Sequence, residues 1–316
     1  MRYADLTREL TAEHGLSVGI VQSHDKYDPA TDSFTEVAVA TYGLDGLLHR
    51  TGSERMYAPH VIRDLTMPKE DAQPVHVAAS GRTFVNPPAL NKLLRRKDLV
   101  YNQMPELQPG TIITSAAEVS SVVDRAPWSR LVVKPAMGML SAGVITGTKA
   151  ELRTALADSP YDSDKALLVQ EFLDTSGGIP ELDVVGLHNI RVIMVGGVAV
   201  LNCIRQSGNR ADILHDDDYG KFGVELPDSM QQLIEQGMQA LERAVPDAND
   251  SVIAIDLMRG IDANGEQRDV ICEINRRPLR ISRYDLLDTV IDQAGLARAA
   301  LAWDVAEARL LASKVA

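Results

Sequence analysis

Three oxygen-bearing side chains lie at the ends of two apolar runs late in the chain. Asp256 lies in the run "SVIAIDLM", and Glu273 and Asn275 end the run "RDVICEIN". Both runs are predicted strands, so Glu273 and Asn275 point to one face while Ile274 points into the core. The turn "DANGEQ" between the runs predicts a hairpin that brings Asp256 across from them. Such converging oxygens suit Mg²⁺, although the acids could equally be solvated or paired with neighbouring arginines.

A lysine followed by small residues forms a second candidate site. Lys134 ends the predicted strand "LVVK", and the loop "PAMGMLSAGV" after it contains Gly138, Ser141, Ala142 and Gly143. Small residues allow backbone N–H groups to approach phosphate oxygens, and the lysine adds a positive charge. The loop lacks the GxxxxGK[ST] order of a Walker A motif. It therefore predicts either another kind of phosphate-binding loop or an ordinary hairpin turn.

A third candidate is the run "LLVQEFLD", in which an apolar strand continues into Gln170, Glu171, Phe172 and Leu173. Backbone groups of a strand that ends in this way can bind the edge of an adenine. Phe172 and Leu173 would add apolar contact with the base.

These motifs, in this order, resemble the ATP-grasp superfamily. The nearest form is its glutathione synthetase-like branch of carboxylate–amine ligases, and the resemblance covers roughly residues 84 to 283. In that branch a segment such as "VNPPALNKLLRRKDL" carries an Asn-x-Pro start and a nucleotide-binding lysine further along. The matching positions, in chain order, are Asn86, Pro88, Lys97, Lys134 with its small-residue loop, "VQEFL", Arg191, Arg205, Asp256 and "EIN".

The resemblance implies a role in binding ATP and Mg²⁺ for most of these positions. The implied metal ligands are Asp256, Glu273 and Asn275, for Mg²⁺ or alternatively Mn²⁺. The implied nucleotide contacts are Lys97 and Lys134 at the α- and β-phosphates, Gly138 and Ser141 in the loop over them, and Gln170, Glu171, Phe172 and Leu173 at the adenine hinge.

Two arginines complete the implied catalytic site. Arg205 matches the arginine that faces the transferred phosphoryl group and the acyl phosphate, and Arg191 occupies the family's second basic position, closer to the nucleotide. Asn189 stands where an acidic ribose contact often occurs, so Glu181 or Asp183 is the expected substitute. The loop "GMLSAG" has fewer glycines than the family often shows, which predicts stiffer closure over phosphate.

The resemblance implies an ADP-forming ligase. A carboxylate attacks the γ-phosphate of ATP to give an acyl phosphate, and an amine then attacks the acyl carbon, which makes an amide or peptide bond and releases phosphate. This chemistry needs positioning and charge neutralisation instead of a covalent nucleophile, and the sequence shows no recognisable Ser/His/Asp or Cys/His motif. Three alternatives stay open: a carboxylate–thiol ligase, a small-molecule kinase of the same fold, and a non-catalytic nucleotide-binding subunit.

Basic residues follow the "EIN" triplet where that branch usually has small or polar ones. Arg276, Arg277 and Arg280 either form salt bridges with nearby acids or clamp a substrate carboxylate by bidentate pairing. The second interpretation predicts an acidic substrate, such as an amino acid, a peptide terminus or a small dicarboxylate.

The elements that must position these residues follow from periodicity and turn signals. The short β-branched runs "LVVK", "AGVIT" and "LLVQEF" predict strands, and a helix is predicted between the last two, where Thr148 and Glu151 have capping-box spacing. Two adjacent glycines in "RVIMVGGVAVL" predict a hairpin. The apolar spacing in "PDSMQQLIEQGMQALERAVP" predicts a helix capped by Asp228, and the C-terminus is predicted to be helical from about Asp285.

Strands clustered with one helix, followed by hairpins backed by helices, predict two α+β units that face each other. With the resemblance, this order indicates an α/β protein of the ATP-grasp fold, in which two α+β subdomains grip ATP. The expected bounds are 1–85 for a small N-terminal α/β unit, 86–175 for a linker and the lid subdomain, and 176–316 for the C-terminal subdomain with the metal site. Within 1–85 the pattern is weak, and "TDSFTEVAVATYGLDGLLHR" fits either helix or strand.

Composition limits the partners. The formal net charge of −12 opposes a broad nucleic-acid surface, and no run approaches the ~18 to 20 apolar residues of a membrane span. The N-terminus lacks the features of a secretory or transit peptide, so a cytoplasmic protein is expected. Cys203 and Cys272 lie in apolar stretches and are predicted to be free thiols. The expected partners are a small-molecule or peptide carboxylate and an amine acceptor, and the resemblance suggests a homodimer through the N-terminal unit.

Overall fold

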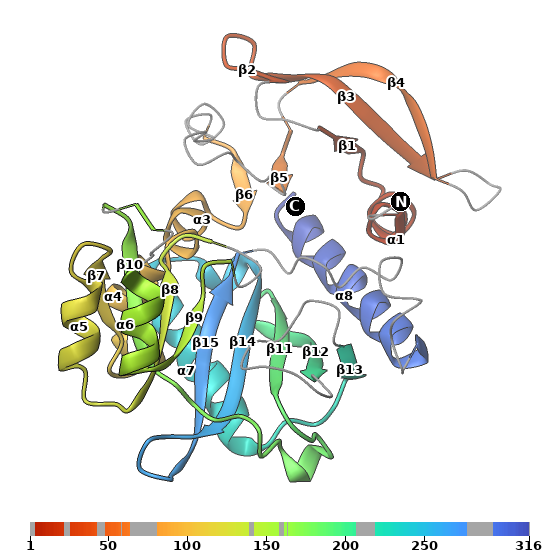
Figure 1. Cartoon of the computed structure of the whole chain (residues 1–316). Coiled ribbons are helices and arrows are strands. Elements are labelled where there is room, and N and C mark those ends of the chain that lie inside the picture. The colour runs from red at the N-terminus through yellow and green to blue at the C-terminus, as the bar shows by residue number, and fades with distance from the viewer. Residues whose placement is uncertain are drawn as a thin grey trace.

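The chain forms a mixed α/β structure built on several sheets (Figure 1). Within the residues that the computed structural model describes, the strands form a four-stranded N-terminal sheet and a short parallel pair. They also form a four-stranded sheet within residues 112–171, named the lid sheet, and a five-stranded sheet within residues 188–275, named the central sheet. None of the helices in this part of the chain is long and apolar enough to cross a membrane. The described residues are 4–21, 26–42, 48–57, 59–63, 81–138, 142–157, 161–162, 164–206, 219–276 and 293–315.

The N-terminal sheet contains the segment whose pattern fits either helix or strand. Its two long strands, β3 (Ser33–Tyr42) and β4 (Leu48–Tyr57), pair antiparallel, so the segment is a strand pair. The chain begins with helix α1 (Ala4–Arg8), continued by the π-helical turn η1 (Glu9–Glu13). The other strands of this region are β1 (Val18–Ile20), β2 (Tyr27–Asp28) and the parallel pair β5 (Val61–Arg63) and β6 (Thr83–Val85).

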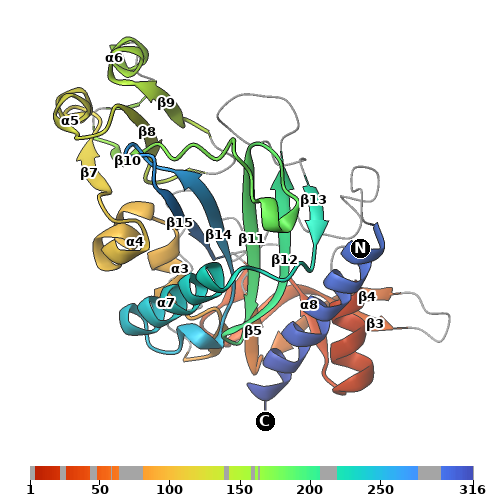
Figure 2. The same cartoon turned by 90° about the horizontal axis from the view of Figure 1, so that it is seen from below.

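The lid sheet is antiparallel, with the strand order β7-β10-β8-β9, and carries two helices on one face (Figures 1 and 2). Leu131 and Val133 pack against these helices. Val132 and Lys134 alternate with them and therefore point to the uncovered face. The lid elements are β7 (Ile112–Ser115), α5 (Val119–Arg125), β8 (Arg130–Pro135), β9 (Ile145–Thr148), α6 (Lys149–Ala157) and β10 (Ala166–Glu171).

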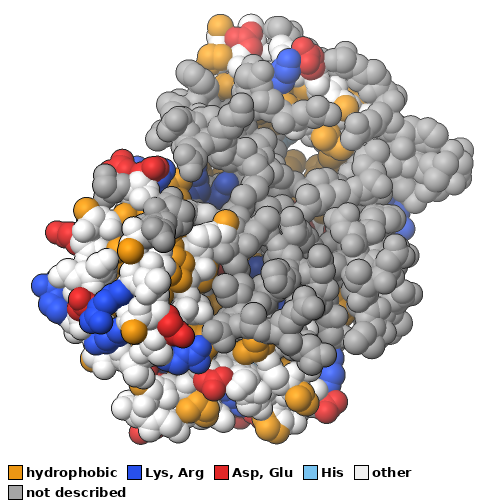
Figure 3. Space-filling view, viewed as in Figure 1, with side chains coloured by type: hydrophobic (Ala, Val, Ile, Leu, Met, Phe, Trp, Pro, Cys, Tyr) orange, Lys and Arg blue, Asp and Glu red, His pale blue; other side chains and the backbone are white. Residues whose placement is uncertain are grey.

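The start of α6 confirms the predicted capping box. The Thr148 backbone N–H donates to Glu151 Oε2 at 2.7 Å, and the Glu151 N–H donates to Thr148 Oγ1 at 3.3 Å. These bonds satisfy N–H groups that a helix start leaves without an intrahelical partner. Acidic and basic side chains are intermixed over the lid, at the left of Figure 3.

The central sheet is also antiparallel, with the order β13-β12-β11-β14-β15. One face packs on helix α7 through alternate residues such as Ile190, Val192 and Ile255. Residues between them, such as Arg191 and Asp256, point to the opposite face. The elements are β11 (His188–Val195), β12 (Val198–Gln206), β13 (Tyr219–Phe222), α7 (Asp228–Ala244), β14 (Val252–Ile261) and β15 (Gln267–Asn275), with the short turns η4 (Pro180–Leu182) and η5 (Ala248–Asp250).

Two turn predictions in this region have different outcomes. The hairpin at Gly196 and Gly197 is confirmed, because β11 and β12 pair antiparallel around them with φ of 59° and 76°. A two-residue hairpin turn needs such positive φ, which glycine adopts without strain. The prediction that Asp228 caps α7 is wrong: Pro227 holds the cap position and Asp228 is the first helical residue. The extended proline (φ −54°, ψ 147°) leads directly into the helix, and Asp228 instead places negative charge near its positive N-terminus.

Helix α8 (Gln293–Ser313) covers part of the other face of the central sheet and confirms the predicted C-terminal helix over these residues. The predicted start near Asp285 lies outside the described residues. Its residues Ala308 and Leu311 share a core with Val252 and Ala254 of β14 and with Leu10. Figures 1 and 2 show α8 between the central sheet and the N-terminal elements. The rest of that sheet face, around Asp256, is not covered by α8 and lies opposite the lid sheet.

Short helices connect the N-terminal region to the lid. They are α3 (Pro88–Leu94), α4 (Lys97–Gln103) and the turn η3 (Pro105–Leu107). Leu90, Tyr101 and Met104 from these segments belong to the same core as α7. This packing fixes the segment that carries Lys97.

Candidate active site

A cavity of ≈ 240 Å³ lies between the lid sheet and the central sheet. Its walls come from β8 and β10 of the lid, from the start of α4, and from β11, β12, β14 and β15 of the central sheet. Both walls are the strand faces that point away from the covering helices α5, α6 and α7. Polar side chains can therefore occupy alternate strand positions here without entering either core.

A β-bulge in β15 sets the orientation of the acidic residues. Asp256 pairs directly with Glu273, and the register shifts immediately afterwards, so that Cys272 is the extra residue. The bulge allows Ile271 and Ile274, three residues apart, to face the same core. The predicted hairpin geometry, with Asp256 across from Glu273 and Ile274 turned inward, is confirmed.

Asp256 is the centre of a buried charge cluster, with only 3% of its side chain exposed. Arg191 donates to both of its carboxylate oxygens at 2.7 Å, and Asn275 Nδ2 donates at 3.0 Å. Arg205 Nη2 lies 3.6 Å from the same carboxylate. Burial alone would raise the pKa of Asp256, but Arg191, Arg205 and Asn275 together hold it below its usual range. Asp256 is therefore a carboxylate anion at neutral pH.

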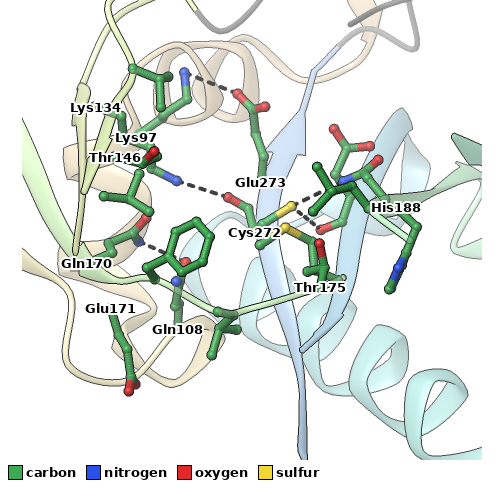
Figure 4. Close-up of a pocket in the computed structure, with 18 of the residues that line it drawn as sticks. Lys97, Gln108, Lys134, Thr146, Gln170, Glu171, Thr175, His188, Cys272 and Glu273 are labelled. Carbon is green, nitrogen blue, oxygen red and sulfur yellow. Dashed lines mark hydrogen bonds and ion pairs between the residues drawn. The ribbon is translucent and has the colours of Figure 1, made fainter. Parts of the chain in front are cut away.

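Two lysines, Lys97 and Lys134, lie across the cavity from Glu273 and Cys272 (Figure 4). Lys97 Nζ lies 3.1 Å from Glu273 Oε1 and donates to the Gly138 carbonyl at 2.9 Å. Lys134 Nζ donates to the Cys272 carbonyl at 3.2 Å. Burial lowers the pKa of the Lys134 ammonium. An anionic ligand between the walls would meet both lysines and would favour the charged form of Lys134.

The carbonyl of the bulge residue has a second donor, the Tyr101 hydroxyl, at 2.6 Å. Tyr101 lies on α4 and is buried, which raises the pKa of its phenol. Burial likewise raises the pKa of the Cys272 thiol to about 12, so this sulfur is a neutral thiol at physiological pH. The thiol donates to the Asp256 carbonyl at 3.2 Å.

The end of β10 ties the lid to the central hairpin. Glu171 Oε1 accepts from the Ala263 N–H at 2.9 Å, and its other oxygen pairs with Arg268 at 3.2 Å. Asp174 and Ile261 exchange two backbone hydrogen bonds of 2.9 Å. In Figure 4 the Glu171 carboxylate points away from the two lysines. The backbone of this segment, with its side chain anchored outward, forms the junction between the two walls.

The predicted hinge residues on either side of Glu171 have different environments. Gln170 is buried and donates to Gln108 Oε1 and Thr111 Oγ1, both at 2.8 Å. Phe172 lines the cavity, and the Arg130 guanidinium lies 4.0 Å from its ring centroid. This cation–π contact orients the ring.

The structure brings most of the predicted site residues together. Arg191 and Asn275 contact Asp256 and are not among the described residues that line the cavity. The predicted residues that do line it are Lys97, Lys134, Gly138, Gln170, Glu171, Phe172, Leu173, Arg205, Asp256 and Glu273.

The remaining predicted positions lie elsewhere. Glu181 is not among the described lining residues, and its carboxylate pairs with Arg259 on β14. Asp183 pairs with Lys221 at 2.9 Å. The carbonyl of the half-buried Arg276 accepts from Asn86 Nδ2 at 2.7 Å. Ser141, Arg277 and Arg280 lie outside the described residues.

Several lining residues were not singled out by sequence reasoning as contacts of a ligand. Gln108 follows a short turn in a segment without strand or helix periodicity, and Cys272 was interpreted only as a buried thiol. Asn189 was noted only for the acid it replaces, although Asn189 and Arg191 are polar residues on alternate positions of β11, on either side of the buried Ile190. Met258 lines the cavity because it lies two residues after Asp256 on β14 and so points to the same face. Thr146 lines it from β9.

The donor set around Asp256 suits a hard divalent cation. Asp256 and Glu273 supply carboxylate oxygens from the paired strands β14 and β15, and Asn275 adds an amide oxygen. Mg²⁺ prefers oxygen ligands of these types. Within the described ranges, His, Cys, Asp and Glu side chains form no metal-binding group of three or more. A metal here would therefore rest on two carboxylates, one amide and oxygens of a bound ligand, which fits Mg²⁺ held together with a nucleotide.

Comparison with known proteins supports the fold. No protein-family model and no curated protein match the sequence. The chain resembles the crystal structure of the D-cycloserine synthetase DcsG with a TM-score of 0.53, at 14% identity over 75% of this chain and 76% of that one. A RimK domain protein described as ATP-grasp, from Sphaerobacter thermophilus, gives a TM-score of 0.48 at 15% identity, over 80% of this chain and 81% of that one. A D-alanine–D-alanine ligase from Bacillus anthracis, complexed with ATP, gives 0.46 at 15% identity over 74% and 72%.

The likeness in fold rests on the first of these structures, whose score exceeds 0.5. The mixed α/β architecture, with a lid sheet facing a larger antiparallel sheet across a cavity, is the ATP-grasp fold that the sequence motifs predicted. At 14% identity the comparison defines the fold alone.

Proposed function

We propose that the chain is an ATP-dependent, ADP-forming carboxylate–amine ligase of the glutathione synthetase-like branch. One observation carries the proposal: Lys97 and Lys134 on one wall of a single cavity face Asp256, Glu273 and Arg205 on the other. Cations and metal-binding carboxylates on opposing walls are what a nucleotide with its divalent ion requires.

The nucleotide would lie along the cavity from the junction segment to the charged end. The base would sit against Phe172 and Leu173, beside the backbone of Glu171, whose side chain is anchored outward. The phosphates would reach Lys97 and Lys134, which now bond to Glu273 and to the Cys272 carbonyl. The two lysines would thus exchange these protein partners for phosphate oxygens.

Asp256, Glu273 and Asn275 would hold Mg²⁺. A bound Mg²⁺ supplies positive charge to the phosphate oxygens as the phosphoryl group is transferred. Arg191 bonds to both oxygens of Asp256 and keeps that carboxylate ionised and oriented. The donor set and this bidentate contact together define what the chain contributes to the metal site.

The reaction would proceed in two displacements. A substrate carboxylate oxygen forms a bond to the γ-phosphorus while the bond from that phosphorus to the bridging oxygen breaks, which gives an acyl phosphate and ADP. An amine nitrogen then attacks the acyl carbon, the carbon–oxygen bond to phosphate breaks, and the amine loses a proton. Arg205, 8% exposed beside Asp256, would neutralise charge on the transferred group.

Arg276, Arg277 and Arg280 would select an acidic substrate. Arg276 directly follows the proposed metal ligand Asn275, and Asn86 holds its carbonyl. A bidentate guanidinium–carboxylate pair at this place would bind an amino acid, a peptide terminus or a small dicarboxylate next to the reacting phosphate.

The test is a screen of carboxylate and amine pairs for ADP and phosphate formation with Mg²⁺ and ATP. We expect both products only when acid and amine are present together, and we expect Glu273→Gln to abolish turnover. The matched control is Glu266→Gln, which removes an exposed glutamate in the β14–β15 turn and should keep full activity. Failure of MgATP to bind would overturn the proposal.

Three other results would each assign a different function. ADP formation with a phosphorylated product and without an amine requirement would indicate a kinase. ADP and phosphate formation that depends on a thiol in place of an amine would indicate a carboxylate–thiol ligase. Nucleotide binding with no ADP formation for any pair would indicate a non-catalytic nucleotide-binding subunit.

A further inference from the structure

Asn189 and Arg205 are direct partners across the β11–β12 hairpin. Asn189 Oδ1 accepts from Arg205 Nε at 3.1 Å and from Arg205 Nη2 at 2.5 Å. Both residues are buried, at 6% and 8% exposure, and both line the cavity. The guanidinium is therefore held by a neutral amide within the wall that faces the lid.

The amide of Asn189 is itself fixed. Its Nδ2 donates to the Cys272 sulfur at 3.4 Å, and that sulfur donates to the Asp256 carbonyl at 3.2 Å. Oδ1 must then point to Arg205, because the two ends of the amide have opposite hydrogen-bonding characters. The bulge in β15 thus sets the direction in which Asn189 presents its acceptor oxygen.

We propose that Asn189 is a positioning residue that holds the Arg205 guanidinium toward the terminal phosphate of a bound nucleoside triphosphate. The inference rests on the proposed function, in which Arg205 meets the transferred phosphoryl group. It also assigns Asn189 a role different from the ribose contact expected at its position.

The chemistry of the amide supports this role. An arginine side chain has many rotamers, and ordering it when the ligand binds costs affinity. Two hydrogen bonds to Oδ1 order the guanidinium in advance. An aspartate at this position would also accept both bonds, but it would neutralise the charge that a phosphate needs. The amide orients Arg205 without adding a second negative charge to that of Asp256, whose carboxylate lies 3.6 Å from the same guanidinium.

A nucleoside diphosphate lacks the group that Arg205 meets, so the ratio of ATP to ADP affinity reports on this contact. The experiment is calorimetric titration of MgATP and MgADP into the wild-type chain, Asn189→Ala, Arg205→Ala and the double variant. We expect Asn189→Ala to lower the affinity for MgATP by about fivefold to tenfold. The affinity for MgADP should change by less than about twofold.

The double variant separates positioning from general structural damage. If Asn189 acts through Arg205, its replacement in the Arg205→Ala background should leave the ATP to ADP ratio unchanged. Additive effects, or a wild-type ratio in Asn189→Ala, would overturn the inference. If Asn189→Ala no longer binds MgADP, Asn189→Ser is measured in its place, with the same ratio of ATP to ADP affinity as the readout.

Asn202 provides the matched control. It lies on the same strand as Arg205, faces the α7 side of the sheet, and bonds to the backbone of Val224 at 2.8 and 2.9 Å. Asn202→Ala should change both nucleotide affinities equally or not at all. If the wild-type chain binds neither nucleotide, the proposed function fails. If the wild-type chain binds both nucleotides and Asn189→Ala has the same ratio of ATP to ADP affinity, only the role of Asn189 is refuted.

Discussion

Lys97 and Glu273 form an ion pair of 3.1 Å between α4 and the central sheet, across the cavity. The proposed phosphate-binding cation and a proposed metal-binding carboxylate therefore neutralise each other in this structure. A nucleotide bound with its metal would separate Lys97 from Glu273 and would give each a new partner of opposite charge. In the proposed function, the binding of metal and of nucleotide would thereby be coupled through this one contact.

Glu273→Gln should bind metal-free ATP more tightly than the wild-type chain, because Lys97 loses its competing carboxylate. We expect a gain of about twofold to fivefold, since the pair is partly exposed. Addition of Mg²⁺ should strengthen ATP binding to the wild-type chain and much less to the variant. Titrations of ATP with a chelator and with Mg²⁺ measure both effects. An unchanged metal-free affinity would mean that the ion pair does not restrain Lys97.

Lys134→Met should stabilise the protein while it weakens ATP binding by tenfold or more. The buried ammonium has a lowered pKa, and replacing a buried ion with an apolar side chain is often stabilising by ~1 kcal/mol or more, or about 2 °C in Tm for a chain of this size class. Thermal melts and ATP titrations measure the two effects. The exposed Lys92→Met is the control and should change neither.

The stabilisation by Lys134→Met should depend on pH in a defined direction. The unfolded chain titrates this lysine near 10.5, whereas burial lowers its pKa in the folded chain. The cost of burying the charge is therefore fully present below the folded pKa and is relieved as pH rises toward 10.5. Melts from pH 7 to 10.5 should show the difference between variant and wild type shrinking. A constant difference would contradict the role of the buried charge.

Local signals in the sequence predicted the elements that carry the site. The strand alternation around Asp256, the turn "DANGEQ" and the capping box at Thr148 and Glu151 each depend on residues close together in the chain, and the structure has all three. The order of the lysine, hinge and acidic motifs predicted the fold through resemblance.

Contacts between distant segments were not predictable in the same way. Tyr101 bonds to the Cys272 carbonyl across 171 residues, and Asn189 bonds to the Cys272 sulfur across 83. Both contacts are made by Cys272, the extra residue of the β-bulge, and no residue pattern in "DVICEIN" predicts a bulge there. Glu181 fits a ribose contact by its position in the chain, but Arg259 on β14 pairs with its carboxylate in the fold.

Glu171→Gln should weaken the binding of both ATP and ADP by about threefold to tenfold. The change replaces the charged partner of Arg268 and of the Ala263 N–H, which anchor the junction segment to the β14–β15 turn. The backbone that we propose to bind the base would lose its fixed position, so the affinities for both nucleotides should fall equally. Glu106→Gln, which removes the exposed partner of Arg243, is the control. An effect on ATP alone would place Glu171 at the phosphates instead.

Asn86→Ala should destabilise the chain by about 3 kcal/mol, because it leaves buried backbone groups without partners. The Asn86 side chain donates to the carbonyls of Val252 and Arg276 at 2.9 and 2.7 Å and accepts from the Val252 N–H at 2.7 Å. It thereby joins the start of β14 to the end of β15, next to Asn275. Urea unfolding measures the loss, and the exposed Asn264→Ala should stay within about 0.5 kcal/mol of wild type. A loss that small for Asn86→Ala would mean that water replaces these bonds, and the exit of β15 toward the arginines would then be held by other contacts.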